Sequence, residues 1–168
     1  MNTNRKTFAV VTAALLLGLA TAASQAADQT SQQLMSAYDQ ALEKGDVEAA
    51  TAAWARDGVI RGTSACPRDN PCTGRESIRD RFIKPQAAAG LRINLIDEKW
   101  QGDTRLRRQE VRSQIISNVG VERIIVNNSY VVRDGAIQTM ENDFDLSDPD
   151  TAKFRAAMVK APSAAGTK

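Results

Sequence analysis

The second half of the chain consists of β-rich runs separated by turn residues, and this pattern constrains the fold more than any other feature. The runs are separated at Gly102-Asp103, Gly120 and Asp134-Gly135. An Asp-Gly pair between two such runs is the strongest short-range signal for a hairpin. We therefore expect an antiparallel meander of long strands. The expected strands are Leu91–Trp100, Arg107–Asn118, Glu122–Val132 and Ala136–Asp145.

The chain before the meander has the spacing of helices. Leu34, Tyr38 and Leu42 recur with the helical period and predict one buried helical face. Trp54 belongs to the expected buried stripe of a second helix, and Pro85 is expected to end a third. The expected helices cover residues 34–44, 46–57 and 75–83, and a short strand covers Val59–Arg61.

Three helices followed by a meander predict the α+β class. The expected architecture is a cone-shaped roll, with three N-terminal helices packed on a curved antiparallel sheet of about four long strands plus one short strand. A last short helix is expected through about Met158.

The first 26 residues have the pattern of a signal peptide. Arg5 and Lys6 precede an apolar run, and Ser24-Gln25-Ala26 fits a cleavage site. The alternative is a retained membrane anchor, which the short apolar run does not favour. We therefore expect a cleaved segment 1–26, a single domain 27–160 and a disordered tail 161–168. The protein would be exported, either periplasmic or secreted, with no membrane span after cleavage.

The charge balance argues against a nucleic-acid partner. The formal net charge is +2, and both surplus positive charges lie in the expected signal peptide. The mature domain would be close to neutral, which gives no basic surface for nucleic acid. The sequence has no histidine and only two cysteines, so we expect neither a metal site nor another cofactor.

Cys66 and Cys72 are expected to form a structural disulfide, because export places them in an oxidising compartment. A loop this short stabilises by roughly 2 kcal/mol in the chain-entropy model. A metal site and a redox pair are the alternatives. The missing histidine disfavours the first, and the spacing, which is not Cys-x-x-Cys, disfavours the second.

Arginine is frequent in the expected meander and allows two interpretations. One is an anionic ligand held by guanidinium groups. The other, which we favour, is a solvated outer face on which arginines pair with Glu98, Glu110 and Glu122. The arginines concerned are Arg92, Arg105, Arg107, Arg108, Arg112 and Arg123.

Three segments together resemble a known superfamily. They are LMSAYDQALEKGDVEAATAAWARDGVI (34–60), GRESIRDRF (74–82) and YVVRDGAIQTMENDF (130–144). In this order they resemble the nuclear transport factor 2-like superfamily, which includes polyketide cyclases and ketosteroid isomerases. The resemblance implies a pocket between the helices and the concave sheet, but no particular function, because members of this fold differ widely in activity.

The resemblance also implies where catalytic groups would lie. In ketosteroid isomerases a tyrosine and a protonated aspartic acid form an oxyanion hole, and a second aspartate is the base. Tyr38 matches the tyrosine, and Asn128 falls at the aspartic acid. The base position falls at Gly62, or at Arg61 if the register slips by one residue. Without a base the proton cannot be moved, so steroid isomerisation is not expected.

A pocket of apolar side chains with a few polar groups is expected inside the cone. Tyr38 could instead be an ordinary buried tyrosine, and the last strand could turn Glu141 and Asp143 inward. We favour the register with Asn142 inward, because burying two like charges is costly. The pocket candidates are Tyr38, Trp54, Phe82, Asn128, Met140, Asn142 and Phe144.

These residues lead to three hypotheses about function. The first is an exported domain that binds a small apolar or carbonyl-bearing molecule without a catalytic base. The second is an isomerase- or cyclase-type enzyme in which Tyr38 and Asn128 polarise a carbonyl. Its base would be one of Asp57, Asp97, Glu141 and Asp143. The third is a protein-interaction module that forms a homodimer through the outer sheet face.

Overall fold

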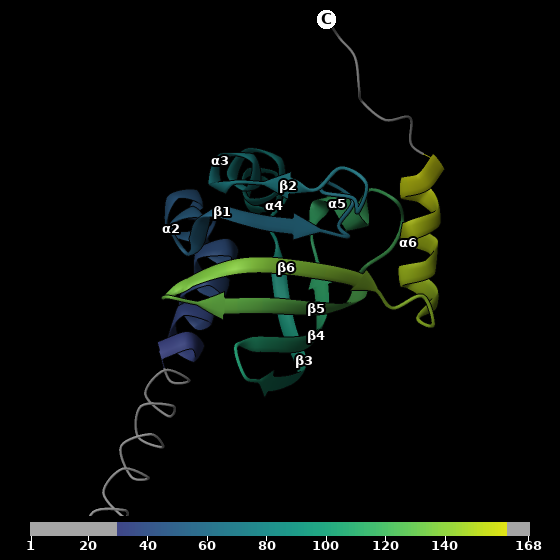
Figure 1. The fold of residues 1–168 in the computed structure, drawn as a ribbon. Coiled ribbons are helices and arrows are strands. Elements are labelled where there is room, and N and C mark those ends of the chain that lie inside the picture. Colours follow the sequence, from purple (N-terminus) through teal and green to yellow (C-terminus); the bar gives the residue numbers. More distant parts are fainter. Residues whose placement is uncertain (1–29, 161–168) are drawn as a thin grey trace, which may run out of the picture.

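The computed structural model describes residues 30–160, which form a six-stranded sheet and the helices that pack on it (Figure 1). The α+β class is therefore confirmed. The expected signal peptide, 1–26, and the expected tail, 161–168, lie outside the described residues. In chain order the elements are a helix over residues 30–44, α2 (Val47–Ala52), β1 (Trp54–Arg61), β2 (Cys72–Thr73), α3 (Arg75–Ile78), the π-helical turn η1 (Arg79–Ile83), α4 (Lys84–Ala88), β3 (Arg92–Gln101), β4 (Thr104–Arg112), α5 (Gln114–Ser117), β5 (Ile124–Arg133), β6 (Ala136–Phe144) and α6 (Pro149–Lys160).

The four long strands form the expected antiparallel meander. The strand order is β2-β1-β6-β5-β4-β3, so each long strand lies beside its neighbour in sequence. Asp134 and Gly135 connect β5 to β6 with φ angles of 52° and 68°. Positive φ at both central residues is what a type I′ hairpin turn requires.

The sheet is mixed and not purely antiparallel, because β1 pairs in parallel with β6. A parallel pair needs a long connection between its strands. Here the connection includes the helices and the rest of the meander. On its other side β1 pairs antiparallel with the two-residue strand β2, which forms this edge of the sheet.

Trp54 corrects the expected second helix. The helix ends at Ala52, and Trp54 is the first residue of β1, where its side chain is completely buried. The pairing with β6 shifts register between Trp54 and Val59, so Asp57-Gly58 lies in an irregular part of the strand. A Cβ on Gly58 would lie 3.0 Å from the Trp54 ring, so glycine makes room for the indole. The helical pattern was outweighed by tertiary packing of the indole.

Pro85 does not end the third helical segment. The chain passes from α3 through η1 into α4, in which Pro85 occupies the first turn. Within η1 the Lys84 N–H bonds to the Arg79 carbonyl, five residues earlier. The helix continues because the wider π-helical turn adjusts the hydrogen bonding just before a residue without an N–H group.

The expected strand 107–118 is also too long. β4 ends at Arg112, and the short helix α5 follows. The Ser113 side chain accepts a hydrogen bond from the Ile116 N–H and caps this helix. A serine cap thus ends the strand within an apolar stretch that sequence periodicity alone assigned to a strand.

Buried apolar side chains form two clusters. The main core contains Tyr38, Trp54, Ile78, Tyr130 and Met140 among others and lies under the helices that precede the meander. The second cluster, which we call the cap cluster, is centred on α5, α6 and the beginning of β5. Its buried members are Ile116, Val121, Ile124, Val126 and Phe154.

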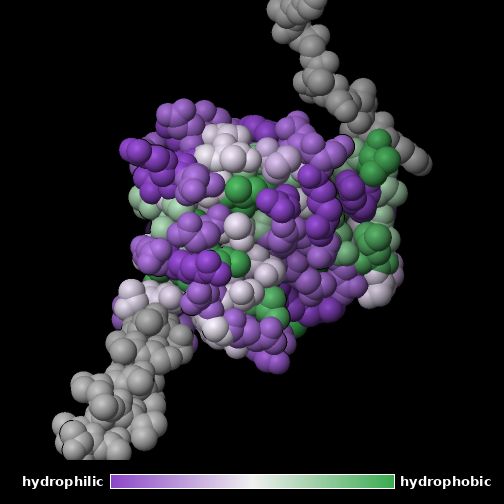
Figure 2. Space-filling model, viewed as in Figure 1, coloured by the Kyte–Doolittle hydropathy of each residue, from purple (hydrophilic) through white to green (hydrophobic). Residues whose placement is uncertain are grey.

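Figure 1 shows α2 at one end of the sheet and α6 at the other, beyond the ends of β1 and β6. Figure 2 shows that this face of the molecule is largely hydrophilic, with apolar side chains gathered mainly at the α6 end. The exposed residues Leu146 and Val159 belong to that end of the chain. Between residues 30 and 160 no helix combines the length and apolar composition needed to cross a membrane.

Candidate ligand pocket

A cavity of about 260 Å³ lies between the main core and the cap cluster. Its walls come from the N-terminal helix, the loop after β1, the η1–α4 segment, the inner faces of β3–β6, and the α5 and α6 region. The lining residues are Tyr38, Leu42, Thr63, Ser64, Ala65, Phe82, Pro85, Gln86, Leu91, Ile93, Gln109, Val111, Ser113, Ile115, Ile116, Ile124, Val126, Asn128, Tyr130, Met140, Asn142, Phe144, Phe154 and Met158. None of the described residues that line this cavity carries a charge.

Three side-chain amides form a row across the inner sheet face. Asn128 Nδ2 donates to Gln109 Oε1 at 2.7 Å, and Asn142 Nδ2 donates to Asn128 Oδ1 at 2.7 Å. The residues lie on the neighbouring strands β4, β5 and β6 and are 1%, 8% and 6% exposed for Gln109, Asn128 and Asn142. We call this row the amide ladder.

The ends of the amide ladder have no partner among the described residues. Gln109 Nε2 is a buried donor without an acceptor, and Asn142 Oδ1 is a buried acceptor without a donor. An unpaired buried polar group costs about 1–3 kcal/mol. The ladder therefore combines two short internal hydrogen bonds with one unused donor and one unused acceptor.

The Tyr38 hydroxyl is a third buried polar group without a hydrogen bond within residues 30–160. Burial raises the pKa of Tyr38 well above its ordinary value of 10.0, and Tyr130 acts in the same direction. The Trp54 indole N–H lies near the hydroxyl and opposes this shift, but the two groups do not form a hydrogen bond of normal geometry. Tyr38 is therefore a neutral hydroxyl that can donate or accept.

Six of the seven candidates from the sequence line the cavity: Tyr38, Phe82, Asn128, Met140, Asn142 and Phe144. The seventh, Trp54, does not. Its indole lies edge-on to the Tyr38 ring, with 6.0 Å between the ring centroids, and is fully buried in the main core. Trp54 supports the wall of the cavity from behind, because its place at the start of β1 points it into the core.

Gln109 is the polar residue that the sequence interpretation missed. It follows Arg107 by two residues and therefore shares its face of β4. Arg105 and Arg107 begin this face of β4, so we interpreted the face as solvated and did not predict that Gln109 points inward. Its alternation with Val111, also in the cavity lining, was the available signal.

The last strand turns its amide inward and its acids outward. Met140 and Asn142 are buried, whereas Glu141 pairs with Arg61 at 3.2 Å and with Arg68 at 3.0 Å. Asp143 pairs with Arg68. The alternative with two inward carboxylates is therefore wrong, and the period of two along the strand explains why both acids leave together.

The position of the missing base cannot accommodate a side chain. Gly62 has a φ of +88°, and a Cβ there would lie 2.1 Å from the backbone oxygen of Asn142. Arg61, the other possible match, forms its ion pair with Glu141. Asp57 and Asp97 are exposed. None of the four proposed bases lines the cavity.

Two of the six arginines are buried, which corrects the expected solvated face. Arg105 and Arg107 are 6% and 5% exposed. Arg107 pairs with Asp39 at 2.7 Å, and Arg105 pairs with Glu98 while its guanidinium lies 5.5 Å from the Trp100 ring centroid. Their pairing with carboxylates keeps them outside the cavity lining. The remaining four are Arg92, Arg108, Arg112 and Arg123; Arg92 bonds to backbone carbonyls, and the other three pair with carboxylates.

The loop after β1 forms a braced wall of the cavity. A disulfide joins Cys66 and Cys72, with 5.1 Å between the Cα atoms. The Arg81 guanidinium donates to the carbonyl oxygens of Ala65, Asn70 and Pro71 at 2.8, 3.1 and 3.1 Å. Thr63, Ser64 and Ala65 of this loop line the cavity.

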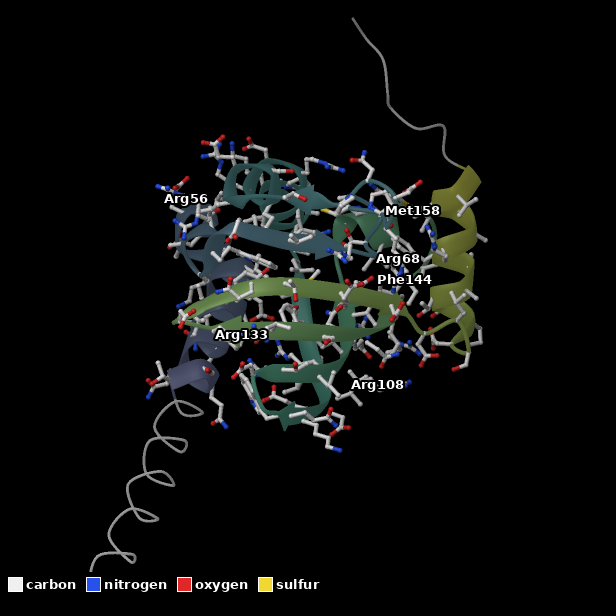
Figure 3. All side chains as sticks on the ribbon, viewed as in Figure 1. Arg56, Arg68, Arg108, Arg133, Phe144 and Met158 are labelled. Atoms are coloured by element: carbon white, nitrogen blue, oxygen red, sulfur yellow. A yellow bond between two sulfur atoms is a disulfide. The ribbon has the colours of Figure 1, made fainter. Side chains whose placement is uncertain are left out.

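A second hollow adjoins the cavity at the α6 end. It shares Thr63, Asn142 and Phe144 with the cavity and is also lined by Arg68 and Arg155. Figure 3 shows Arg68, Phe144 and Met158 close together between the end of β6 and α6. The Arg155 guanidinium lies 5.6 Å from the Phe144 ring centroid. Phe144 therefore lies at the boundary between the cavity and this hollow.

Known structures define the class of this domain. No protein-family profile matches the sequence, and no curated protein matches it. Solved structures do match the chain in three dimensions. The chain has the nuclear transport factor 2-like fold, so the resemblance seen in the sequence is confirmed at the level of the fold.

Three of the similar structures illustrate the range of the fold. One is the epoxide hydrolase/cyclase-like enzyme SalBIII, which has a role in pyran ring formation in the polyether salinomycin. Its TM-score is 0.61 at 15% identity, and the match covers 72% of this chain and 95% of that one. A computationally designed 17-OHP binder has a TM-score of 0.59 and 14% identity, with 70% and 92% covered. A putative polyketide cyclase from Sinorhizobium meliloti has a TM-score of 0.55 and 20% identity, with 66% and 94% covered.

Proposed function

We propose that this protein binds a small, neutral, largely apolar molecule in the cavity between the main core and the cap cluster. The supporting observation is the lining itself: among the described residues it is apolar with a few neutral polar groups, and no charged side chain contributes. Such a lining favours a neutral ligand, because a charged one would be desolvated without a counter-charge. Ligand pockets of this kind orient their ligand with a small number of polar groups.

The protein would act as an exported binding domain, periplasmic or secreted. The disulfide at the cavity wall supports this proposal, because disulfides persist in oxidising compartments. The designed 17-OHP binder with the same fold also supports a ligand-binding use of the cone. We propose no reaction, because catalysis by proton transfer needs an acid or base within reach of the ligand.

Native mass spectrometry of protein purified from its own host tests this proposal. We expect a co-purified neutral compound, released on denaturation, and a protein mass that fits cleavage after residue 26 and one disulfide. A carboxylate-bearing ligand would contradict the neutral class. The same spectrum reports whether the first 26 residues are removed.

A homodimer is a second proposal, supported by β3. This edge strand exposes Leu95 and Ile96 at 43% and 49%. Exposed apolar residues on an edge strand, which has unpaired backbone groups, favour pairing with another chain. Sedimentation of the wild type and of the Ile96→Lys variant tests it: we expect a dimer for the first and a monomer for the second. A wild-type monomer at high concentration would reject the proposal.

A further inference from the structure

We propose that the amide ladder selects a neutral ligand that carries one hydrogen-bond acceptor and one donor at opposite ends of an apolar body. This inference rests on the proposed function and specifies its ligand class. A carbonyl or ether oxygen would pair with Gln109, and a hydroxyl or amide N–H would pair with Asn142. The ladder thereby becomes a specificity element in addition to a structural one.

The composition of the ladder leads to one donor and one acceptor. Each amide contributes an oxygen that accepts and an NH₂ group that donates. The bond from Asn128 to Gln109 and the bond from Asn142 to Asn128 each use one NH₂ group and one oxygen of the row. Gln109 Nε2 and Asn142 Oδ1 are left unpaired. Turning all three amides together reverses the direction of the row but still leaves one donor end and one acceptor end. A ligand with only acceptors or only donors can satisfy one end at most.

The spacing of the strands sets the length of the ligand. Gln109 and Asn142 lie on β4 and β6, with β5 between them. Neighbouring strands are about 4.8 Å apart, so the two ends of the ladder are separated by roughly 10 Å. The polar groups of the ligand would therefore be at its two ends, with an apolar middle against Asn128, Met140 and Tyr130, which also line the cavity.

The surroundings exclude the charged counterparts of such a ligand. A carboxylate in the cavity would need a cation. The buried Arg105 and Arg107 are already paired with Glu98 and Asp39, and Arg155, which lies over the Phe144 ring, belongs to the adjoining hollow and not to the cavity lining. Arg107 is the cross-strand partner of Asn128, but its charge is matched by Asp39 at 2.7 Å. Selection thus depends on hydrogen-bond complementarity, which discriminates strongly when the unmatched group would remain buried and unpaired.

Four rigid biphenyl probes of similar shape test the inference on the folded protein by calorimetry. The first is 4-acetyl-4′-hydroxybiphenyl, with an acceptor and a donor. The others are 4-acetylbiphenyl, 4-ethylbiphenyl, and 4′-hydroxybiphenyl-4-carboxylic acid as the charged analogue. We expect the first probe to bind best, with a loss of about tenfold for each hydrogen bond removed and a larger loss for the carboxylate.

Variants assign the discrimination to the ladder. In the triple variant Gln109→Met, Asn128→Leu, Asn142→Leu, the whole row is apolar, so no amide remains without its partner and the fold should be retained. We expect this variant to bind 4-ethylbiphenyl at least as well as wild type and to lose its preference for the first probe. Asn127→Leu is the matched control, because Asn127 is the exposed neighbour of Asn128 on the other face of β5, and it should keep the wild-type ranking.

The outcomes separate the ligand class from the binding function. Equal affinity for 4-ethylbiphenyl and the first probe would overturn the role of the ladder while leaving an apolar binding site in place. Preference for the carboxylate would overturn the neutral class. If no probe binds at all, both this inference and the proposed function are rejected.

Discussion

The main core and the cap cluster bury apolar surface by different means. The main core is covered by several helices and contains the fully buried Trp54, Ile78 and Ile83. The cap cluster is covered by the four-residue helix α5 and by the single helix α6. One region therefore has many mutually supporting contacts, whereas the other depends on two helices that are far apart in sequence.

Polar contacts hold the beginning of α6 in place. Asp148 pairs with Arg123 at 2.8 Å, and the Thr151 hydroxyl accepts from the Ile125 N–H at 2.8 Å. The Lys153 ammonium donates to the Gly120 carbonyl at 2.7 Å. Phe154 and Met158 beyond these contacts line the cavity.

This difference indicates how the cavity is built. The main core includes Tyr38 of the N-terminal helix and packs against the sheet that carries the amide ladder, while the cap cluster closes the other end of the cavity. Segments with few buried contacts open at lower free energy than the rest of a protein. We therefore expect local opening to be easiest at the α6 end, where Phe144 lines both the cavity and the adjoining hollow.

The largest effect is expected from Trp54→Ala in the main core. Removing a completely buried indole should cost about 4 kcal/mol of unfolding free energy. Urea denaturation followed by circular dichroism measures it. The loss should be global, with α6 and the sheet unfolding in one transition. A loss below about 1 kcal/mol would mean that the main core is not the stable half of the molecule.

Phe154→Ala in the cap cluster should cost about 3 kcal/mol, at the low end for a buried phenylalanine, because the neighbouring helix can collapse or detach. We expect the loss to be local. Amide hydrogen exchange should accelerate in α6 and α5 while β5 and β6 keep their protection. Uniform acceleration in all elements would show that the two clusters unfold as one unit. Val159→Ala is the matched control in the same helix, because Val159 is 68% exposed.

Removing the disulfide by Cys66→Ser, Cys72→Ser should cost about 2 kcal/mol. Arg81 still holds the loop through three carbonyl groups, so we expect the fold to persist. Chemical denaturation with and without reductant measures the effect: reductant should destabilise wild type and leave the double variant unchanged. Wild-type stability unchanged under full reduction would contradict the expectation.

The smallest effect concerns Asp148 and acid. Burial acts to raise the pKa of Asp148, but hydrogen bonds from Thr151 and Arg123 outweigh it and leave the pKa below the ordinary value of 3.8. Since the folded-state pKa is the lower one, the stabilisation is present above pH 3.8 and is lost as the pH falls through the folded value.

We therefore expect the start of α6 to loosen below about pH 4 before the main core does. NMR shifts of α6 and β6 amides across the acid range test this order. Asp148 Oδ1 accepts from the Thr151 N–H at 2.9 Å and so caps α6. Asp148→Ala, which removes this cap at all pH values, should cost about 1 kcal/mol and abolish the early step. Simultaneous acid unfolding of both regions in wild type would contradict the assignment.

Much of the fold could be predicted from local patterns. The Asp134-Gly135 hairpin, the meander and the disulfide depend on residues close in sequence, and so does the inward face of the last strand. The errors occurred where tertiary contacts outweighed local preference. Trp54 continued a helical stripe but begins β1, and Pro85 looked like a helix end but follows a π-helical turn.

The alternation of residues along each strand determined by itself which side chains share a face, because the period of a strand is two. The cost of burying two like charges favoured Asn142 as an inward amide, and the family resemblance pointed to Asn128. Only the tertiary structure decided that they lie side by side and that Gln109 completes the row, since strand register depends on contacts between distant segments. The parallel pairing of β1 with β6, which brings Gly62 against the Asn142 backbone, likewise depends on the whole chain. Local sequence sets the direction of each side chain, and long-range pairing sets its neighbours.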